Sequence, residues 1–568
     1  ERGSLATQLC SRLPFYHCLA AIMASAISYT GENSGFQVGQ NNGHITAQFP
    51  QPETSLNQAC LRDLRTTNPG DDKERIKTTN GGLLKESYYW ILDNEQFEQW
   101  QENQTNRLLW IRGDPGKGKT MLLCGIIEEL TQSIGDTANI SFFFCQATDA
   151  RINNATAVLR GLIYSLVLKQ PSLLSHVRSR YDQAGKALFE DINAWNAVSR
   201  IFTDILKDPT LQDTYLMVDA LDECTTDLPF LLDLIVQKSP VYPNVKWIVS
   251  SRNWSSIKET LDAAPQETKI CLELNETSVA EAVGIFIHDK VQKLKRKKGY
   301  TAEIQNAVHD HLMSNANGTF LWVALVCQYL DKIPRDPMAK LHKFPPGLDP
   351  LYKRMMNEML QSEKLESEDI DLCKRILGFM AVVYRPITLT ELVSFTEPSE
   401  DISDNFDSLK LDISLCGSFL IVKDDIVYFV HQSAKDFLVE NSSNVIFPTG
   451  AEKVHHTMFS RSLQAMEKAL RRNIYSLCAL GLPISQVKQP KRDPLASVKY
   501  SCIHWVDHLH DSHSSGTPVR LEDLQDGGVV DNFLRANYLH WLEALSLIGG
   551  VSGFKGNLKW LLKRLPSG

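Results

Sequence analysis

The chain has 568 residues, of which 43% are hydrophobic and 22% are charged, an ordinary composition for a globular protein of several domains. Its formal net charge of -8 gives no general electrostatic reason to bind nucleic acid. The twelve cysteines include no Cys-x-x-Cys pair, which argues against a zinc ribbon or a disulfide framework and predicts a reducing, cytoplasmic location.

Residues 1–60 form the first segment, and we expect most of it to be disordered. From Asn33 to Phe49 it is rich in Gly, Asn and Gln, a composition that is disordered alone but prone to β-stacking. Apolar residues alternate on both sides of the turn signal Asn42-Gly43. On composition alone, a flexible polar linker is the favoured interpretation. The apolar run 15–27 is too short for a membrane helix, and a secretion signal is the disfavoured interpretation.

Residues 61–104 are charged and partly helical in pattern, so we expect a helical linker. An apolar strand at 108–111 follows, then Gly-x4-Gly-Lys-Thr and a helix-like run. This order is the context of a phosphate-binding P-loop. The glycines let backbone N–H groups turn toward phosphate oxygens, and the helix start adds its positive dipole end. The predicted nucleotide-binding residues are Gly113, Asp114, Pro115, Gly116, Lys117, Gly118, Lys119, Thr120 and Met121.

Within the P-loop, Lys119 is expected to reach the outer phosphates, and the Thr120 hydroxyl is expected to ligate Mg²⁺. Further apolar, strand-like runs follow, separated by longer stretches with helical periodicity. Near-continuous apolar strands that alternate with helices indicate a parallel sheet covered on both faces. We therefore predict a doubly wound α/β P-loop NTPase domain over residues 105–275. The additional strands are expected at residues 140–144, 215–218, 245–249 and 270–274.

Acidic residues follow the strand at 215–218. Ligands of open α/β sheets bind beyond the carboxyl ends of the strands, so Asp219 is placed to hold Mg²⁺. Asp222 and Glu223 are candidates to orient or deprotonate the attacking water. The alternative is an acidic surface turn. We disfavour it because the acidic residues follow a P-loop by about 100 residues. Arg252, after the strand at 245–249, could contact the γ-phosphate; an ordinary surface arginine is the alternative.

Beyond residue 275 the pattern is mostly helical. We expect a small helical domain at 276–343, formed by the helical stretches 279–293 and 302–333. A winged-helix domain is expected at 344–445, with a hairpin at 419–422 and 426–430, and an all-α unit at 446–568. The basic run 293–298 is interpreted as a solvated helix end in preference to a nuclear signal. His504 and His508 are interpreted as packed or solvated histidines in preference to zinc ligands.

Together, residues 113–120, 219–223 and 250–252 resemble the NACHT NTPase domain of signal-transducing ATPases with numerous domains. Stretches elsewhere in the chain are similar to the fungal, incompatibility-type NOD-like receptors. The resemblance implies a five-stranded core with the P-loop strand in the middle, and helical and winged-helix units packed over the nucleotide. In related receptors a winged-helix histidine touches the bound diphosphate, and His431 is the matching position. The matching stretches are 81–84, 109–111, 159–164, 318–322, 347–352 and 431–438.

The resemblance also implies a switch: an off state that holds the diphosphate, and an on state that oligomerises with the triphosphate. Residues 31–50 resemble the sigma motif of some such receptors, which templates a β-fold onto an effector protein. Because the rest of the chain resembles such a receptor, we favour this interpretation over the flexible polar linker. Receptors of this kind often carry a repeat array after the helical segment, and no repeat occurs up to Gly568.

The predicted function is a switch in fungal non-self recognition or programmed cell death. It binds ATP or GTP with Mg²⁺, hydrolyses it slowly and forms a homo-oligomer on activation. It then engages an effector that carries an amyloid motif, and any action on membranes would be the effector's. A remodelling ATPase and a scaffold that binds nucleotide only for stability are the alternatives. The sequence does not decide between ATP and GTP.

Overall fold

The computed structural model describes residues 53–264, 267–332, 337–361, 366–396, 406–416, 419–477, 487–513 and 521–549, with residues 482 and 484. They divide into two compact units, a larger one over Asn57–Val454 and a smaller one that contains the described residues from His455 onward. The sequence motif expected at 31–50 lies outside the described residues. No described helix is long and apolar enough to cross a membrane.

Short helices precede the sheet in the larger unit. They are α3 (Glu53–Leu64), α4 (Pro69–Thr79), α5 (Lys85–Tyr88), a 3-10 turn at Tyr89–Ile91 and α6 (Glu95–Glu102). Local signals explain α4, because the Asn68 side chain accepts a hydrogen bond from the Gly70 N–H and Pro69 occupies the first turn. Helix α3 begins before residue 61, where the helical linker was expected, and its buried Cys60 and Leu64 belong to the main core.

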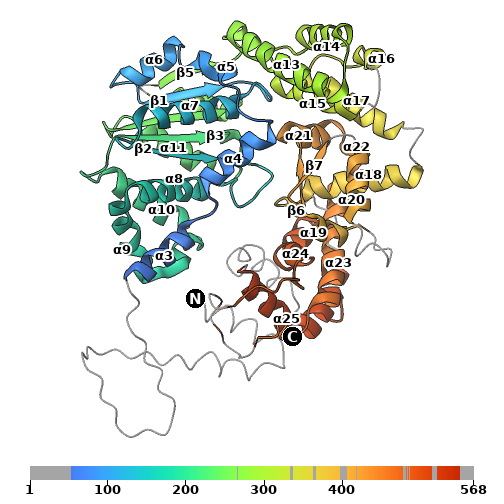
Figure 1. Cartoon of the computed structure of the whole chain (residues 1–568). Coiled ribbons are helices and arrows are strands. Elements are labelled where there is room, and N and C mark those ends of the chain that lie inside the picture. The colour runs from blue at the N-terminus through green and yellow to red at the C-terminus, as the bar shows by residue number, and fades with distance from the viewer. Residues whose placement is uncertain are drawn as a thin grey trace. The chain divides into compact units, whose positions relative to one another are not determined.

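The sheet has five parallel strands in the order β2-β3-β4-β1-β5. This confirms the predicted fold class (Figure 1). The P-loop strand β1 is not in the middle, however; β4 is, because β4 pairs with β3 on one side and with β1 on the other. The strands are β1 (Leu108–Arg112), β2 (Asn139–Phe144), β3 (Thr214–Asp219), β4 (Val245–Ser251) and β5 (Glu267–Cys271).

Strand β5 ends earlier than the sequence suggests. Its last pair in the ladder joins Cys271 to Arg112. The apolar pattern continues to Leu274, but that side chain is 82% exposed, so the run leaves the sheet in a turn before the next helix. Hydrophobicity alone does not mark this end, because both sides of the boundary are apolar.

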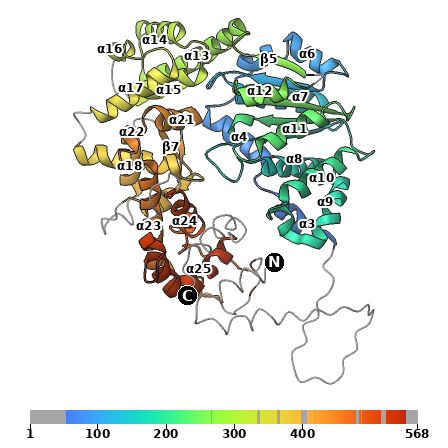
Figure 2. The ribbon, with the colours of Figure 1, turned by 180° about the vertical axis from the view of Figure 1, so that it is seen from behind.

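Helices cover both faces of the sheet (Figure 1; seen from behind in Figure 2). On one face, the core joins Trp110 and Trp247 to α8, α10, α11 and α12. On the other face, α7 packs against β2, β3 and β4. Strand residues are buried on both faces, which explains the near-continuous apolar runs. The helices are α7 (Lys119–Ile134), α8 (Ala155–Lys169), α9 (Leu174–Ala184), α10 (Ala194–Leu206), α11 (Leu228–Lys238) and α12 (Ser255–Leu261).

A helical region follows. The helical stretch expected at 302–333 contains two helices, because Asn317 and Gly318 adopt positive φ angles of 47° and 63° and break the helical path. The basic run forms the last turns of α13 and ends at Gly299, where cations face the negative end of the helix dipole. The helices are α13 (Glu276–Lys298), α14 (Ala302–Asn315), α15 (Phe320–Lys332), α16 (Met338–Leu341) and α17 (Leu348–Leu360).

The expected hairpin forms around Asp424 and Asp425, which have the positive φ angles that two-residue hairpin turns require. A third strand, β6, pairs with β8 and escaped the sequence analysis because it has only two residues. The elements are α18 (Ser367–Val382), β6 (Ile387–Thr388), α19 (Leu389–Val393), α20 (Phe406–Leu415), β7 (Leu420–Lys423), β8 (Ile426–Phe429), α21 (Gln432–Asn441) and α22 (Ser443–Ile446).

The smaller unit is helical and has its own core, in which the rings of Trp505 and Trp541 meet edge to face at 5.5 Å. His508 is fully buried, and its Nε2 lies 2.7 Å from the Tyr500 hydroxyl. Among the described residues, no group of three His, Cys, Asp or Glu side chains is arranged to hold a metal. The elements are most of α23 (Ala451–Ala469), α24 (Lys499–Asp511), a 3-10 turn at Leu521–Leu524 and α25 (Val529–Ile548).

Candidate nucleotide-binding site

The loop between β1 and α7 is shaped by two glycines. Gly116 and Gly118 have φ angles of +77° and +89°, a region that glycine enters without a steric penalty. Space also excludes a side chain: a Cβ at Gly118 would lie 2.9 Å from the Phe320 ring, and one at Gly116 would lie 2.8 Å from Leu321 Cβ. The Leu321 N–H donates to the Gly116 carbonyl at 3.3 Å. The start of α15 therefore packs directly on the loop.

Lys119, the first residue of α7, turns its side chain back along the loop. Its Nζ donates to the Gly113 carbonyl at 2.5 Å and to the Asp114 carbonyl at 3.0 Å. Burial lowers the pKa of Lys119, and the carboxylates of Asp222 and Asp219 oppose this effect. The ammonium is thus held beside the glycine loop, where a P-loop lysine meets the outer phosphates.

Thr120 and Asp219 meet although 99 positions separate them in the sequence. The Thr120 hydroxyl donates to Asp219 Oδ2 at 2.7 Å, and the Ser250 hydroxyl donates to Asp219 Oδ1. Burial raises the pKa of Asp219, while the bonds from Ser250 and Thr120 lower it. A hydroxyl and a carboxylate are the hard oxygen ligands that Mg²⁺ takes beside phosphate oxygens and water. These residues fit the ion that the sequence predicts.

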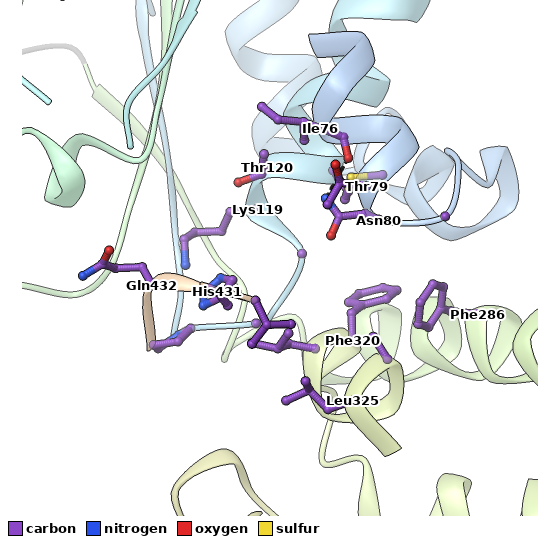
Figure 3. A pocket seen from close by; sticks show the side chains of 18 of the residues that line it. Ile76, Thr79, Asn80, Lys119, Thr120, Phe286, Phe320, Leu325, His431 and Gln432 are labelled. Atoms are coloured by element: carbon purple, nitrogen blue, oxygen red, sulfur yellow. Dashed lines mark hydrogen bonds between the residues drawn. The ribbon is translucent and has the colours of Figure 1, made fainter. Parts of the chain in front are cut away.

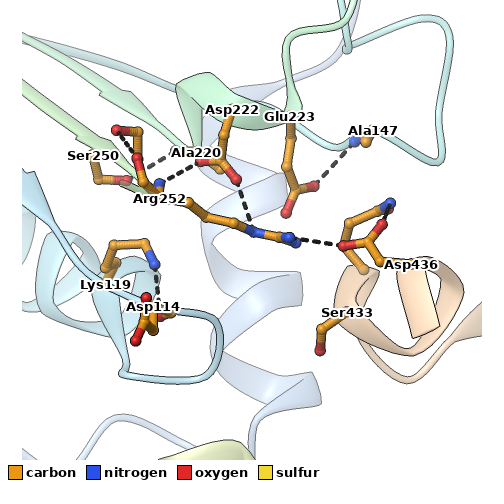
Figure 4. A network of polar contacts seen from close by, with 12 residues as sticks. Asp114, Lys119, Ala147, Ala220, Asp222, Glu223, Ser250, Arg252, Ser433 and Asp436 are labelled. Carbon is orange, nitrogen blue, oxygen red and sulfur yellow. Dashed lines mark hydrogen bonds and ion pairs between the residues drawn. The ribbon is translucent and has the colours of Figure 1, made fainter. Parts of the chain in front are cut away.

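Asp222 and Arg252 are joined to the winged-helix region (Figure 4). The Arg252 backbone N–H donates to Asp222 Oδ1 at 2.9 Å, and its Nε lies 3.0 Å from Asp222 Oδ2. Its Nη1 bonds Asp436 Oδ2 at 2.8 Å, and Asp436 Oδ1 accepts from Gln432 at 2.7 Å. Burial alone would lower the pKa of Arg252, but Asp436 and Asp222 raise it above its usual value. The guanidinium therefore bridges the 3-10 turn after β3 (Leu221–Glu223) and helix α21.

Glu223 has a different environment from Asp222. Its Oε2 accepts a hydrogen bond from the Ala147 N–H at 3.0 Å (Figure 4). Burial, and then the charge of Asp222, raise the pKa of Glu223 to about 8. This carboxyl is therefore largely protonated at neutral pH and needs a change of surroundings before it can take a proton.

His431 caps helix α21. Its Nδ1 accepts from the Ser433 N–H at 3.1 Å, and the Ser433 hydroxyl lies 2.9 Å from the same nitrogen and 2.9 Å from the Tyr352 hydroxyl. Burial, with the charges of Arg252 and Lys119, lowers the pKa of His431 to about 3. The ring is neutral, and because Nδ1 accepts from a backbone N–H, its proton lies on Nε2.

One cavity of about 630 Å³ (Figure 3) is lined by Lys119, Thr120, Asp219, Asp222, Glu223, Arg252 and His431. Lys119, Thr120, His431 and Gln432 lie at one end of it. Away from them, α4 forms one wall, and α13 and α15 form the facing wall. The labelled wall residues are Ile76, Thr79 and Asn80 on the first wall and Phe286, Phe320 and Leu325 on the second.

Most of the residues predicted from sequence lie on this cavity. Those that line it are Pro115, Gly116, Gly118, Lys119, Thr120, Met121, Asp219, Asp222, Glu223, Arg252 and His431. Gly113, Asp114 and Lys117 are not among its lining residues. The Lys117 ammonium instead bonds the Asn317 carbonyl at 2.7 Å and ties the loop to the α14–α15 turn.

The sequence analysis gave no role to Asp436 or to the cavity walls. Signals were present, because the stretches 81–84, 318–322 and 431–438 carried the family resemblance. Spacing alone could not assign their roles, since these contacts join segments more than a hundred residues apart.

Comparisons with known proteins fit this geometry. A model of the nephrocystin 3 N-terminal family matches residues 86–252, and a model of the winged-helix domain of GPI inositol-deacylase matches residues 356–448. The chain is also 53% identical, over 504 residues and 86% of its length, to the vegetative incompatibility protein HET-E-1 of Podospora anserina. These matches support a fungal NACHT-type incompatibility protein. This confirms the family that the sequence motifs indicate.

The chain spans 37% of the length of HET-E-1. Among solved structures, this NACHT-type chain is similar to the Walker-type ATPase PABY2304 of Pyrococcus abyssi, with 12% identity, a TM-score of 0.29, and coverage of 62% of this chain and 95% of that one. It is also similar to PCH-2 of C. elegans, with 14% identity, a TM-score of 0.27, and coverage of 53% and 72%.

Proposed function

We propose that this chain is a nucleotide-operated switch that binds ATP or GTP with Mg²⁺ and hydrolyses it slowly. One observation carries the proposal: Lys119, the Thr120–Asp219 pair, Glu223, Arg252 and His431, which come from distant parts of the sequence, all line one cavity. The specific roles below are part of the proposal.

Binding begins at the glycine loop. Phosphate oxygens replace the loop carbonyls as partners of Lys119, and the amides of the loop and of the α7 start donate to them. Thr120 and Asp219 would hold Mg²⁺, which when bound neutralises charge on the phosphates. At the winged-helix side, His431 Nε2–H is a neutral donor that can bind a phosphate oxygen without adding charge.

Hydrolysis requires a base for the attacking water, and Glu223 is the candidate. Water attacks the γ-phosphorus, the bond to the bridging oxygen breaks, and the proton of the water passes to the Glu223 carboxylate. The raised pKa of Glu223 keeps this base mostly protonated at neutral pH, and Arg252 is occupied by two carboxylates. Both features support slow turnover and favour a switch over a remodelling ATPase.

The switch itself is the contact between Arg252 and Asp436. A γ-phosphate that attracts Arg252 competes with Asp436 and favours release of α21, so the triphosphate binds the open form better than the closed one. Open chains then form a homo-oligomer, which gathers copies of residues 31–50 and lets them template an amyloid motif of an effector protein. We place this process in the cytoplasm, in fungal incompatibility, with no nucleic-acid partner; any action on membranes belongs to the effector.

The test uses the purified chain and Lys119→Ala, with turnover and molar mass measured in diphosphate, triphosphate and a non-hydrolysable triphosphate. The expected result is slow turnover, larger particles with triphosphate, and loss of both in the variant. Rapid turnover by monomers would favour a remodelling ATPase. Equal nucleotide binding by Lys119→Ala would contradict the assignment of the site.

A further inference from the structure

Among the described residues that line the cavity, one ammonium group has no polar partner. It belongs to Lys290 of α13, which lines the cavity wall beside Phe286. Its Nζ lies 4.9 Å from the centroid of the Phe286 ring. No oxygen of the described residues accepts a hydrogen bond from it, and no described carboxylate forms an ion pair with it. Burial, and then the charge of Lys293, lower the pKa of Lys290.

Two neighbouring lysines of α13 already have carboxylate partners. Lys293 forms an ion pair with Asp289 at 2.7 Å, and Lys297 forms one with Asp331 at 2.6 Å. Of these three lysines, Lys290 is therefore the one without a carboxylate partner among the described residues. The Phe286 ring and the charge of Asp289 offset only part of the desolvation of Lys290, and an acceptor brought by a ligand would offset more of it.

The surroundings of Lys290 suit the edge of a flat ring. The rings of Phe286 and Phe320 meet edge to face at 5.4 Å on this wall, and Ile76 of α4 lies on the facing wall (Figure 3). The ammonium lies against the backbone of Gly81. There is no room for a side chain at this position, because a Cβ would lie 2.5 Å from Lys290 Nζ. The apolar walls can take the faces of a base, and the ammonium meets its rim.

We infer that Lys290 is a specificity-determining residue that donates to the acceptor edge of the nucleotide base and selects 6-oxopurines over adenine. The chemistry of the two edges differs. Guanine and hypoxanthine present two neighbouring acceptors, O6 and N7, whereas adenine presents the acceptor N7 beside an amino donor. A cationic donor is complementary to the first edge and meets a like donor on the second. This inference rests on the proposed nucleotide site and deepens it.

The test compares the non-hydrolysable forms of GTP, ITP and ATP by calorimetry with Mg²⁺ and the full chain. ITP carries O6 but lacks the 2-amino group, so it isolates the edge that Lys290 contacts. We expect GTP and ITP to bind about tenfold more tightly than ATP, the size expected for a hydrogen bond to a charged group. Lys290→Met is expected to reduce this preference to less than about threefold.

Lys297→Met is the matched control, because it removes a lysine of the same helix that already has a carboxylate partner; it is expected to keep the preference. Tight ATP binding with weak ITP binding would overturn the inference, as would equal losses for all three nucleotides in Lys290→Met. If none of the nucleotides binds the wild-type chain, the proposed site itself fails. Lys119-dependent binding without a preference refutes the role of Lys290 alone.

Discussion

The ion pair between Arg252 and Asp436 makes a quantitative prediction for Asp436→Asn. The two side chains are 16% and 27% exposed, with 2.8 Å between Nη1 and Oδ2. Unit charges about 4 Å apart attract by about 4 kcal/mol at an effective dielectric constant near 20, and desolvation offsets much of this gain. We therefore expect the pair to stabilise the closed form by about 1.5 kcal/mol, or about tenfold in the closed-to-open ratio.

The variant is suited to this measurement because Asn keeps the shape of the side chain, and Asp222 still pairs with Arg252. No buried charge is left alone, so the fold is expected to persist. Release of a fluorescent diphosphate in a stopped-flow instrument should become about tenfold faster. Asp424→Asn is the control, since Asp424 is exposed on the hairpin turn with a positive φ that Asn tolerates. Equal release rates in Asp436→Asn and the wild type, or equal acceleration in both variants, would refute the reasoning.

Three further predictions concern other parts of the chain. Only ionised Glu223 accepts a proton, and its pKa is about 8, so the rate of single-turnover hydrolysis should rise with pH through 8. Glu223→Gln should bind nucleotide but lose this rise. A flat pH profile of the wild type would count against Glu223 as the base. Gly118→Ala should weaken triphosphate binding at least about tenfold, since φ is +89° and the new Cβ would contact Phe320; titration calorimetry checks this, with the exposed Gly135→Ala, which meets no neighbour, as the control for strain alone. Trp505→Ala should destabilise the smaller unit by about 3–5 kcal/mol, which a melting experiment would show as a transition at lower temperature. Nucleotide affinity should stay unchanged, because Trp505 belongs to a separate core. A parallel loss of affinity would contradict this expectation.

Much of the site could be predicted because its chemistry is local in the sequence. The loop from Gly113 to Thr120 carries its own strand and helix signals, and Asp219 follows a buried strand, so their positions follow from sheet topology. The strand order could not be derived in the same way. The sequence does not say which neighbour β4 chooses, and the expectation that β1 is central was wrong.

Contacts between distant segments were the other limit. Asp436 and Lys290 look like ordinary charged residues on helices, and only the folded chain brings Asp436 to Arg252 and Lys290 to the cavity. Turns were missed for a related reason: the break at Asn317-Gly318 depends on two left-handed residues, which helical periodicity on either side conceals. The ends of strands and helices were therefore less predictable than their existence.

The central place of β4 has a mechanical consequence. Its last two residues and the residue that follows make three contacts in succession: Ser250 bonds Asp219, Ser251 accepts from the Trp110 indole at 2.9 Å, and Arg252 pairs with Asp222 and Asp436. A small axial displacement of this one strand would alter all of these contacts together. Conservative changes in its buried interior are therefore expected to shift the proposed switch without removing any of these chemical groups.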